Sequence, residues 1–161
     1  MNEDTFYYDC NLKITDILTE GISRMEYEKI MALRNREYEF GRLLSIAIED
    51  VNEGYAKGSL QVKSECMNPI GSVHGGCIFF LADTIGGTAA LSYGYYATTV
   101  SGNINYLNPA INTSILTAVA RVVKHGKNII VCDVDIFDEK DTIIAKGTFS
   151  YFNLNKPLEL D

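Results

Sequence analysis

The sequence predicts an α+β domain in which an antiparallel sheet packs on one long buried helix. Three observations predict this class: an apolar, glycine-containing run over residues 74–94, strand-like runs on both sides of it, and short turns between successive strands. The chain has 161 residues, 47% of them hydrophobic and 22% charged, which is typical of one globular domain. We divide it into an N-terminal helical extension (1–40), the folded domain (41–152) and a C-terminal tail (153–161).

The central run reads as a helix that is apolar nearly all round, which indicates burial. Its apolar positions are Ile78, Phe79, Leu81, Ala82, Ile85, Ala89, Ala90 and Leu91. Gly86 and Gly87 each cost about 1 kcal/mol relative to alanine in a helix. We therefore expect another backbone, that of a partner subunit, to approach closely there. Residues 11–40 have an imperfect helical spacing that Gly21 is expected to divide.

Six strands are expected, over residues 44–48, 56–63, 98–107, 114–124, 128–138 and 142–152. The predicted turns are Asn52-Glu53-Gly54, Asn108-Pro109-Ala110, His125-Gly126-Lys127 and Asp138-Glu139-Lys140-Asp141. Because short turns between successive strands imply antiparallel pairing, we expect a meander.

The net charge of −7 argues against nucleic acid as a partner. Residues 11–40 are also net acidic, which disfavours a DNA-binding regulator. No apolar run reaches the roughly 18 residues of a membrane span, and the start Met1–Asp4 is acidic, unlike a signal peptide. We therefore expect a cytoplasmic protein with no membrane partner.

Four cysteines occur, at Cys10, Cys66, Cys77 and Cys132, and none forms a C-x-x-C pair. Only 2 histidines are present to complete a metal site. The sequence therefore predicts reduced thiols and neither a metal site nor a disulfide framework.

Asp83 is the only formally charged residue between Cys66 and Ala120, so we expect this segment to form the interior of the molecule. A buried carboxylate is costly unless it is paired or hydrogen-bonded. Asp83 is therefore a catalytic candidate. The alternative is a structural aspartate that caps a loop or bonds Thr84 or a backbone amide.

The run Asn68–Gly76 contains Pro69 and three glycines and leads into the helix. The first N–H groups of a helix are unpaired and lie at the positive end of its dipole. Gly75 and Gly76 leave these donors unshielded, so an oxygen that becomes negative during a reaction would be stabilised there. His74 and Asn68 are neighbouring polar groups. Taken singly, a helix cap, a turn residue and packing glycines explain them equally well.

His74 and Asp83 are nine residues apart. On one helix this separation corresponds to about 900° of rotation and about 13 Å of rise. The two side chains then lie on opposite sides, too far apart to contact one carbonyl. If both act on one substrate, they come from different chains, and a homodimer with two composite sites is the simplest arrangement.

Two motifs together resemble a known family. The run from Asn68 to Asp83, Asn-Pro-Ile-Gly-Ser-Val-His-Gly-Gly-Cys-Ile-Phe-Phe-Leu-Ala-Asp, is followed by Asn103 to Ala110, Asn-Ile-Asn-Tyr-Leu-Asn-Pro-Ala. This combination resembles the hotdog-fold acyl-CoA thioesterases, of the phenylacetate-pathway and thioesterase-superfamily-member-2 type. The resemblance covers about residues 41–152 and gives residues 1–40 no role in the chemistry.

The resemblance implies a sheet wrapped around a central helix and a dimer with interfacial active sites, commonly paired into a tetramer. It implies hydrolysis of an acyl-CoA without a metal or cofactor, CoA being part of the substrate. Asp83 then acts as general base or nucleophile, and the Gly75 N–H polarises the thioester oxygen. His74 and Asn68 act from the other subunit, and Thr99 helps to place the water.

The CoA end is expected at a basic turn in this acidic protein. The turn residues are Lys124, His125, Gly126, Lys127 and Asn128, with Arg121 nearby. The strongly anionic nucleotide of CoA needs such a cluster. The family places the nucleotide near this turn and near the stretch that contains Tyr106, Asn108 and Pro109. The alternative is a plain solvated hairpin.

Two other functions stay open at this point: a hydratase or dehydratase on the same fold, and an acyl-CoA-binding protein without catalysis. Release of free thiol from acyl-CoA distinguishes hydrolysis from both. The sequence leaves the acyl group undetermined, with Tyr93, Tyr95 and Tyr96 as candidates for shaping its pocket, and an acyl-carrier-protein thioester is a further possible substrate.

Overall fold

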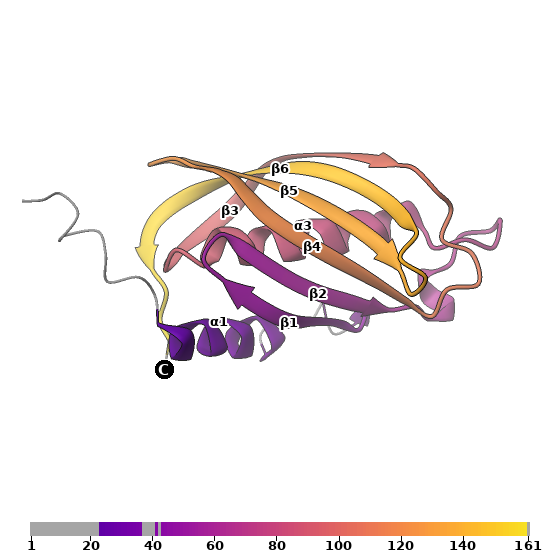
Figure 1. The fold of residues 1–161 in the computed structure, drawn as a ribbon, viewed down its shortest axis with the longest axis horizontal. Coiled ribbons are helices and arrows are strands. Elements are labelled where there is room, and N and C mark those ends of the chain that lie inside the picture. Colours follow the sequence, from indigo (N-terminus) through magenta and orange to yellow (C-terminus); the bar gives the residue numbers. More distant parts are fainter. Residues whose placement is uncertain (1–22, 37–40, 42, 161) are drawn as a thin grey trace, which may run out of the picture.

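The computed structural model describes residues 23–36, 41 and 43–160. The elements are α1 (Arg24–Arg36), β1 (Ile46–Asn52), β2 (Tyr55–Gln61), the 3-10 turn η2 (Ser64–Cys66), α3 (Gly75–Leu91), β3 (Tyr95–Tyr106), β4 (Ile115–His125), β5 (Ile129–Asp138) and β6 (Ile143–Pro157), as Figure 1 shows. The expected helix before Ser23, its break at Gly21, and Cys10 lie outside the described residues. Among the described residues, no helix combines the length and apolar character needed to cross a membrane.

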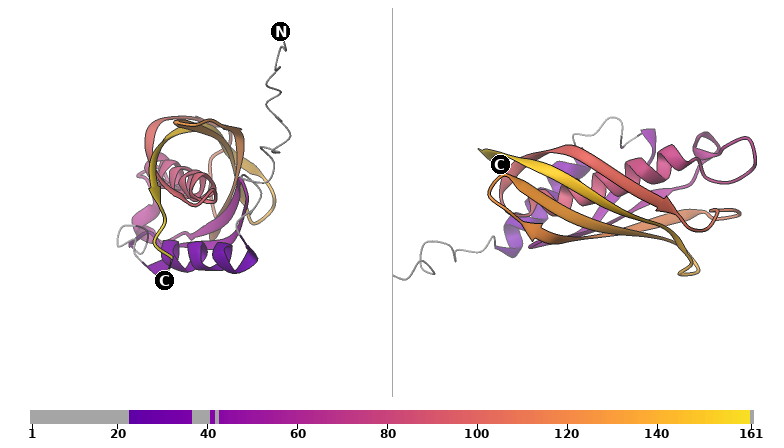
Figure 2. Two further views of the ribbon diagram at one scale, coloured as in Figure 1. Left: turned by 90° about the vertical axis from the view of Figure 1, so that its left-hand side faces the viewer. Right: turned by 90° about the horizontal axis from the view of Figure 1, so that it is seen from above.

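The six strands form one antiparallel sheet in the order β1-β2-β4-β5-β6-β3. Seen along the helix in the left view of Figure 2, the sheet curves around α3, and α1 lies across the side that the sheet leaves open. This arrangement confirms the predicted fold class, because a helix that is apolar nearly all round needs cover on most of its surface.

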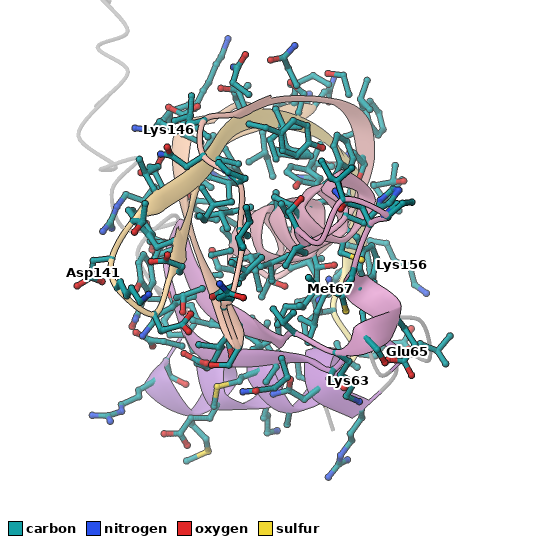
Figure 3. All side chains as sticks on the ribbon, turned by 90° about the vertical axis from the view of Figure 1, so that its right-hand side faces the viewer. Lys63, Glu65, Met67, Asp141, Lys146 and Lys156 are labelled. Atoms are coloured by element: carbon teal, nitrogen blue, oxygen red, sulfur yellow. The ribbon has the colours of Figure 1, made fainter. Side chains whose placement is uncertain are left out.

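Small and branched side chains fill the space between helix and sheet. Leu81, Ala82 and Ile85 of α3 are fully buried. They meet alternating residues of β4 and β5, of which Ala118, Ala120, Cys132, Val134 and Ile136 are buried. This period-2 alternation turns one face of the sheet toward α3 and the other toward solvent. The labelled charged side chains in Figure 3, among them Lys63, Glu65, Asp141 and Lys146, lie at the rim of the molecule.

The expected meander is wrong in one connection. The chain from Asn108 through Ala110 does not join two paired strands, because β3 pairs with β6 at the far edge while β4 pairs with β2 and β5. Placing β1–β2 and β3 at opposite edges of β4–β5–β6 lets the sheet close around α3 from both sides (Figure 1). The other three predicted turns do join antiparallel neighbours.

The expectation that the whole uncharged segment is interior is also wrong. Most of α3 is buried, but every residue of β3 is exposed or half-buried in the single chain. Val100 of β3 is 58% exposed. Natural edge strands usually carry charges that block pairing with another chain, and β3 carries none. The β3 edge therefore lacks charges, as a buried edge does, although no other part of its own described chain covers it.

The helix α1 is anchored to the domain by both apolar and polar contacts. Ile30 is fully buried in the common core. The Asn35 amide pairs with the backbone of Ile48, accepting from its N–H at 2.8 Å and donating to its carbonyl at 3.0 Å. Arg34 reaches α3, donating from Nε to Thr88 Oγ1 at 3.0 Å and from Nη2 to the Thr84 carbonyl at 3.3 Å. The described helix of the N-terminal extension, Arg24–Arg36, thus packs on the domain.

Gly86 and Gly87 lie against a side chain of the same chain, and the expected approach of a partner backbone stays a prediction. The Tyr151 ring of β6 lies over them, and a Cβ at Gly86 would be 2.4 Å from the Tyr151 hydroxyl oxygen. A Cβ at Gly87 would be 3.4 Å from Tyr151 Cε1, an ordinary contact. The two glycines therefore face the same ring with different clearances.

This difference gives a matched pair of variants. We expect Gly86→Ala to lose about 1–3 kcal/mol of unfolding free energy, because the new methyl group overpacks the ring. Gly87→Ala should gain up to about 1 kcal/mol from helix propensity. Urea unfolding of both variants measures the two effects, and equal changes would contradict the assigned packing of Tyr151.

Candidate active site

Asp83 lies half-buried in the middle of α3, where hydroxyl groups from two strands reach it. Thr99 Oγ1 of β3 donates to Asp83 Oδ1 at 2.9 Å. The Tyr151 hydroxyl of β6 lies 3.3 Å from the same oxygen and 3.0 Å from the Asp83 carbonyl oxygen. The carboxylate is thus bound by two strand hydroxyls, where the alternative had placed Thr84 or a backbone amide.

The two strands deliver these hydroxyls in register. Thr99 and Tyr151 are partners in the β3–β6 ladder, so both side chains arrive at the same level of α3. Tyr151 is only 1% exposed. Burial, together with the neighbouring Asp83 carboxylate, raises the pKa of Tyr151 far above its ordinary value. Its hydroxyl group therefore stays protonated and acts as a hydrogen-bond donor.

A cavity of about 150 Å³ opens beside Asp83. Its lining comprises Arg34, Phe80, Asp83, Thr84, Gly87, Leu91, Ala97, Thr98, Thr99 and Tyr151. Phe80, Asp83, Gly87 and Leu91 follow one another at helical spacing along a stripe of α3. The cavity therefore lies where α3 emerges from its sheet, between β3 and α1.

The predicted helix start is present at His74–Gly76. His74 is the N-cap residue, and its Nδ1 accepts from the Gly76 N–H at 2.9 Å. The His74 carbonyl accepts from Cys77 and Ile78. In the described part of the chain, the Gly75 N–H donates to no other group. This amide is therefore an available donor at the positive end of α3.

Asn68 organises the loop in front of α3. Its Oδ1 accepts from the Ile70 and Ser72 N–H groups at 3.1 and 3.0 Å, and its Nδ2 donates to Ser72 Oγ at 2.8 Å. This is the turn role that its residue type predicted as an alternative. Within one chain, Asn68 thus shapes the segment that carries His74 and Gly75.

His74 and Asp83 both lie on α3, one at its N-cap and one in its middle. The structure therefore retains the separation of about 13 Å that nine helical residues impose. Within one chain, Asp83 is brought together with Thr99, and Gly75 is brought together with Tyr106, whose hydroxyl donates to the Gly75 carbonyl at 2.9 Å. A site that uses Asp83 and the Gly75 amide on one carbonyl needs two chains.

The predicted CoA residues fall at two ends of the sheet. The turn Lys124–Asn128 joins β4 and β5 at the end where His125 pairs with Ile130. Tyr106 pairs with Ala145 at the other end, and Asn108 and Pro109 follow it. Within one chain these groups are not brought together, so one nucleotide could contact both only across subunits.

Two of the predicted CoA-binding residues, His125 and Arg121, contact aromatic rings of the same chain. The His125 ring stacks on Tyr93, with centroids 3.7 Å apart and planes inclined by 11°. Arg121 lies over the Tyr55 ring at 5.0 Å. It also lines a hollow on the outer sheet face with Asp133 and Asp135, two acidic neighbours. Asp133 and Asp135 place negative charge beside Arg121, so of the predicted basic residues it has the surroundings least favourable to an anion.

The three cysteines that the structure describes carry no sign of reactivity. Cys66, Cys77 and Cys132 are buried free thiols. Burial raises the pKa of Cys77 to about 11 and that of Cys132 to about 12, so both stay protonated at neutral pH. The described residues contain no cluster of three or more His, Cys, Asp and Glu side chains that could hold a metal ion.

Sequence reasoning missed Tyr151 and Arg34. Tyr151 lies in an ordinary strand pattern that gives no reason to single out one aromatic residue. Its only trace in the sequence was Gly86, which had been interpreted as room for a partner backbone. Arg34 comes from a segment that had been given no chemical role, yet it lines the Asp83 cavity. Neither contact leaves a local signal, because both depend on elements far from Asp83 in the chain.

Residues 70–145 match the family described as the thioesterase superfamily. The Escherichia coli acyl-coenzyme A thioesterase PaaI is 34% identical over 104 residues, which are 65% of this chain and 74% of that protein. The chain belongs to the thioesterase superfamily. It is a thioester hydrolase.

Several solved structures share the fold. That of Escherichia coli PaaI, from the phenylacetic acid degradation operon, gives a TM-score of 0.76 at 28% identity and covers 81% of this chain and 97% of its own. A Streptococcus mutans protein bound to acetyl CoA gives 0.67 at 30% identity, covering 70% and 91%. A hypothetical thioesterase of Streptococcus pneumoniae with coenzyme A gives 0.66 at 30%, covering 70% and 88%.

The Streptococcus pneumoniae thioesterase has also been crystallised as an aspartate-to-alanine and as a threonine-to-alanine variant. The two mutated positions are 16 residues apart. Asp83 and Thr99, the hydrogen-bonded pair of this thioesterase, are also 16 residues apart. The pair of residue types and its spacing are therefore common to the two chains.

His74 offers a test that separates capping from chemistry. His74→Ala leaves the Gly76 N–H without its acceptor and should lose about 1 kcal/mol of stability, with a smaller loss of thioester hydrolysis than removal of the Asp83 carboxylate. His74→Asn restores a capping oxygen but no imidazole. Thermal unfolding and turnover of both variants are measured. Full activity in His74→Asn assigns a capping role, whereas a stable but impaired variant assigns the imidazole to the substrate.

Proposed function

We propose that the protein hydrolyses an acyl-CoA, with a fatty or aromatic acyl group, to the free acid and CoA. The observation that carries this proposal is the half-buried Asp83 carboxylate, fixed by Thr99 and facing a cavity on an otherwise uncharged helix. Its relatives support the choice of substrate, because PaaI is named an acyl-coenzyme A thioesterase and two similar structures contain acetyl CoA or CoA.

The site is assembled from two chains. Asp83 of one subunit faces the Gly75 N–H of its partner, and the thioester carbonyl lies between them. Two features support a second copy along β3: the strand is an uncharged sheet edge, and Val100 on it is 58% exposed. Two-fold symmetry then gives each dimer two equivalent sites, and two dimers pair into a tetramer.

In the reaction, the Gly75 N–H donates to the carbonyl oxygen as negative charge develops on it. Asp83 either takes a proton from the attacking water or attacks the carbonyl carbon directly. In both routes the carbon–sulfur bond breaks, and the thiolate leaves and is protonated. In the direct route a water molecule then hydrolyses the acyl anhydride on Asp83, which releases the free acid and restores the carboxylate. No redox group is required, since neither route changes an oxidation state, and no metal is required, since the Gly75 N–H polarises the carbonyl and Asp83 activates the nucleophile or supplies it. The cavity beside Asp83, about 150 Å³ in this chain, has the size that holds one benzene-like group.

The nucleotide of CoA is placed at the basic turn Lys124–Asn128, with the Tyr106–Pro109 stretch contributed by another subunit. The exposed Lys124 and Lys127 supply positive charge in a chain of net charge −7. A dense anion such as a phosphate group is attracted by such a local cluster whatever the sign of the whole protein.

Asp83→Asn should lower kcat for thiol release from acyl-CoA about a hundredfold to ten-thousandfold, because the amide cannot accept the proton. The matched control is Asp141→Asn, at an exposed turn residue with φ 60°, a conformation that asparagine tolerates. A panel of acyl-CoAs identifies the acyl group in the same assay. Full turnover in Asp83→Asn would refute the assignment of Asp83. Tight binding of acyl-CoA without thiol release by the wild type would instead identify an acyl-CoA-binding protein without catalysis.

The amide donor can be removed without breaking α3. Gly75 is the first helical residue, where proline is accommodated, and His74 before it is extended at ψ 132°, as proline requires. Gly75→Pro should therefore fold but lose about a hundredfold in kcat. Gly75→Ala keeps the N–H and adds only a Cβ about 3.2 Å from Tyr106.

The same variants test the two-chain site. Co-expressed Gly75→Pro and Asp83→Asn chains form heterodimers in which one site has both residues intact, so activity should return. Absence of recovery in a confirmed heterodimer would mean that each site belongs to one chain.

A further inference from the structure

Both hydroxyl groups that reach Asp83 meet it at the same carboxylate oxygen. Thr99 donates to Oδ1 at 2.9 Å, and the Tyr151 hydroxyl lies 3.3 Å from Oδ1. Among the described residues, no group donates to Oδ2. The two oxygens of the carboxylate are therefore in different environments, one held by strand hydroxyls and one without a donor, on a residue that lines the cavity.

The position of Tyr151 is set by packing on three sides. Its side chain is 1% exposed, and its ring stacks with Phe149 at 6.5 Å. Gly86 lies directly beneath the hydroxyl, where any Cβ would collide with it. The hydroxyl group shares its one hydrogen between the Asp83 carbonyl oxygen at 3.0 Å and Oδ1 at 3.3 Å, so it bridges the backbone and the side chain of one residue. Because the packing fixes the Tyr151 ring, its hydroxyl group can fix the orientation of the Asp83 carboxylate.

We propose that Tyr151 is a positioning residue for the reaction: together with Thr99 it fixes Oδ1 of Asp83, so that the other oxygen alone faces the substrate. This inference rests on the proposed function and deepens it, because it assigns the reacting oxygen. An oxygen that accepts two hydrogen bonds has fewer lone pairs to offer. The open oxygen therefore takes the proton of the attacking water, or attacks the carbonyl carbon itself.

In the general-base route the atoms balance without a further reactant. The open oxygen of Asp83 takes one proton while the water oxygen bonds to the carbonyl carbon. The carbon–sulfur bond then breaks, and the same proton passes to the leaving thiolate. Asp83 ends as a carboxylate, still held at Oδ1 by Thr99 and Tyr151. Throughout, the orientation of the carboxyl plane decides whether the open oxygen meets the water.

Tyr151→Phe tests this role because it removes the hydroxyl and keeps the ring over Gly86. The variant should fold, leave KM for acyl-CoA unchanged and lower kcat about tenfold, which corresponds to one lost hydrogen bond. The matched control is Tyr27→Phe, which removes a hydroxyl from a half-buried tyrosine of α1, outside the Asp83 cavity. Its kcat should equal that of the wild type.

Thr99→Val, alone and combined with Tyr151→Phe, tests whether the two hydroxyls share one task. Two donors on one oxygen are coupled, so the double variant should differ from the product of the single effects. Multiplicative effects, a wild-type kcat in Tyr151→Phe, or a change in KM alone would overturn the positioning role.

Asp83→Asn is measured in the same series. If it is inactive while Tyr151→Phe is unimpaired, only the positioning role fails. If Asp83→Asn is fully active, the assignment of Asp83 fails and the positioning role fails with it, whereas the proposed function itself fails if the wild type releases no thiol from acyl-CoA.

Discussion

The architecture depends on enclosing one almost wholly apolar helix. No flat sheet covers enough of α3, so the strands curve around it, and this curvature requires β1–β2 and β3 at opposite edges. The remaining side of α3 is where Asp83, Gly87 and the cavity lie, with α1 across the opening. Burying a carboxylate between helix and sheet would be costly, so Asp83 can lie on this helix only along the stripe that the sheet of its own chain leaves uncovered.

The same helix separates the two halves of the chemistry. The free Gly75 amide lies at its start and Asp83 lies in its middle, on the other side. A rigid helix cannot bring them together, so the proposed function takes the missing half from a second copy along the exposed, uncharged β3 edge. Within the chain, the glycine pair at 86 and 87 makes room for Tyr151.

Much of the fold and part of the site could be predicted. The helix over 74–94 corresponds to Gly75–Leu91, and the predicted strands recur with shifted ends, β3 starting at Tyr95 and β6 continuing to Pro157. Asp83 could be identified because it is the only charge in a long uncharged segment. The pairing of β3 could not, because an antiparallel ladder is compatible with either neighbour when only the turn is known.

The sequence alone determined what is encoded by local pattern: the apolar helix, the alternating strands, the open helix start at Gly75 and the chemical identity of the acid. Tertiary structure decided which groups meet that acid. Thr99 and Tyr151 come from strands that pair across the sheet, and Arg34 arrives from α1. Their convergence is a consequence of how the sheet closes, since hydrogen-bond register and curvature depend on contacts between residues distant in the chain.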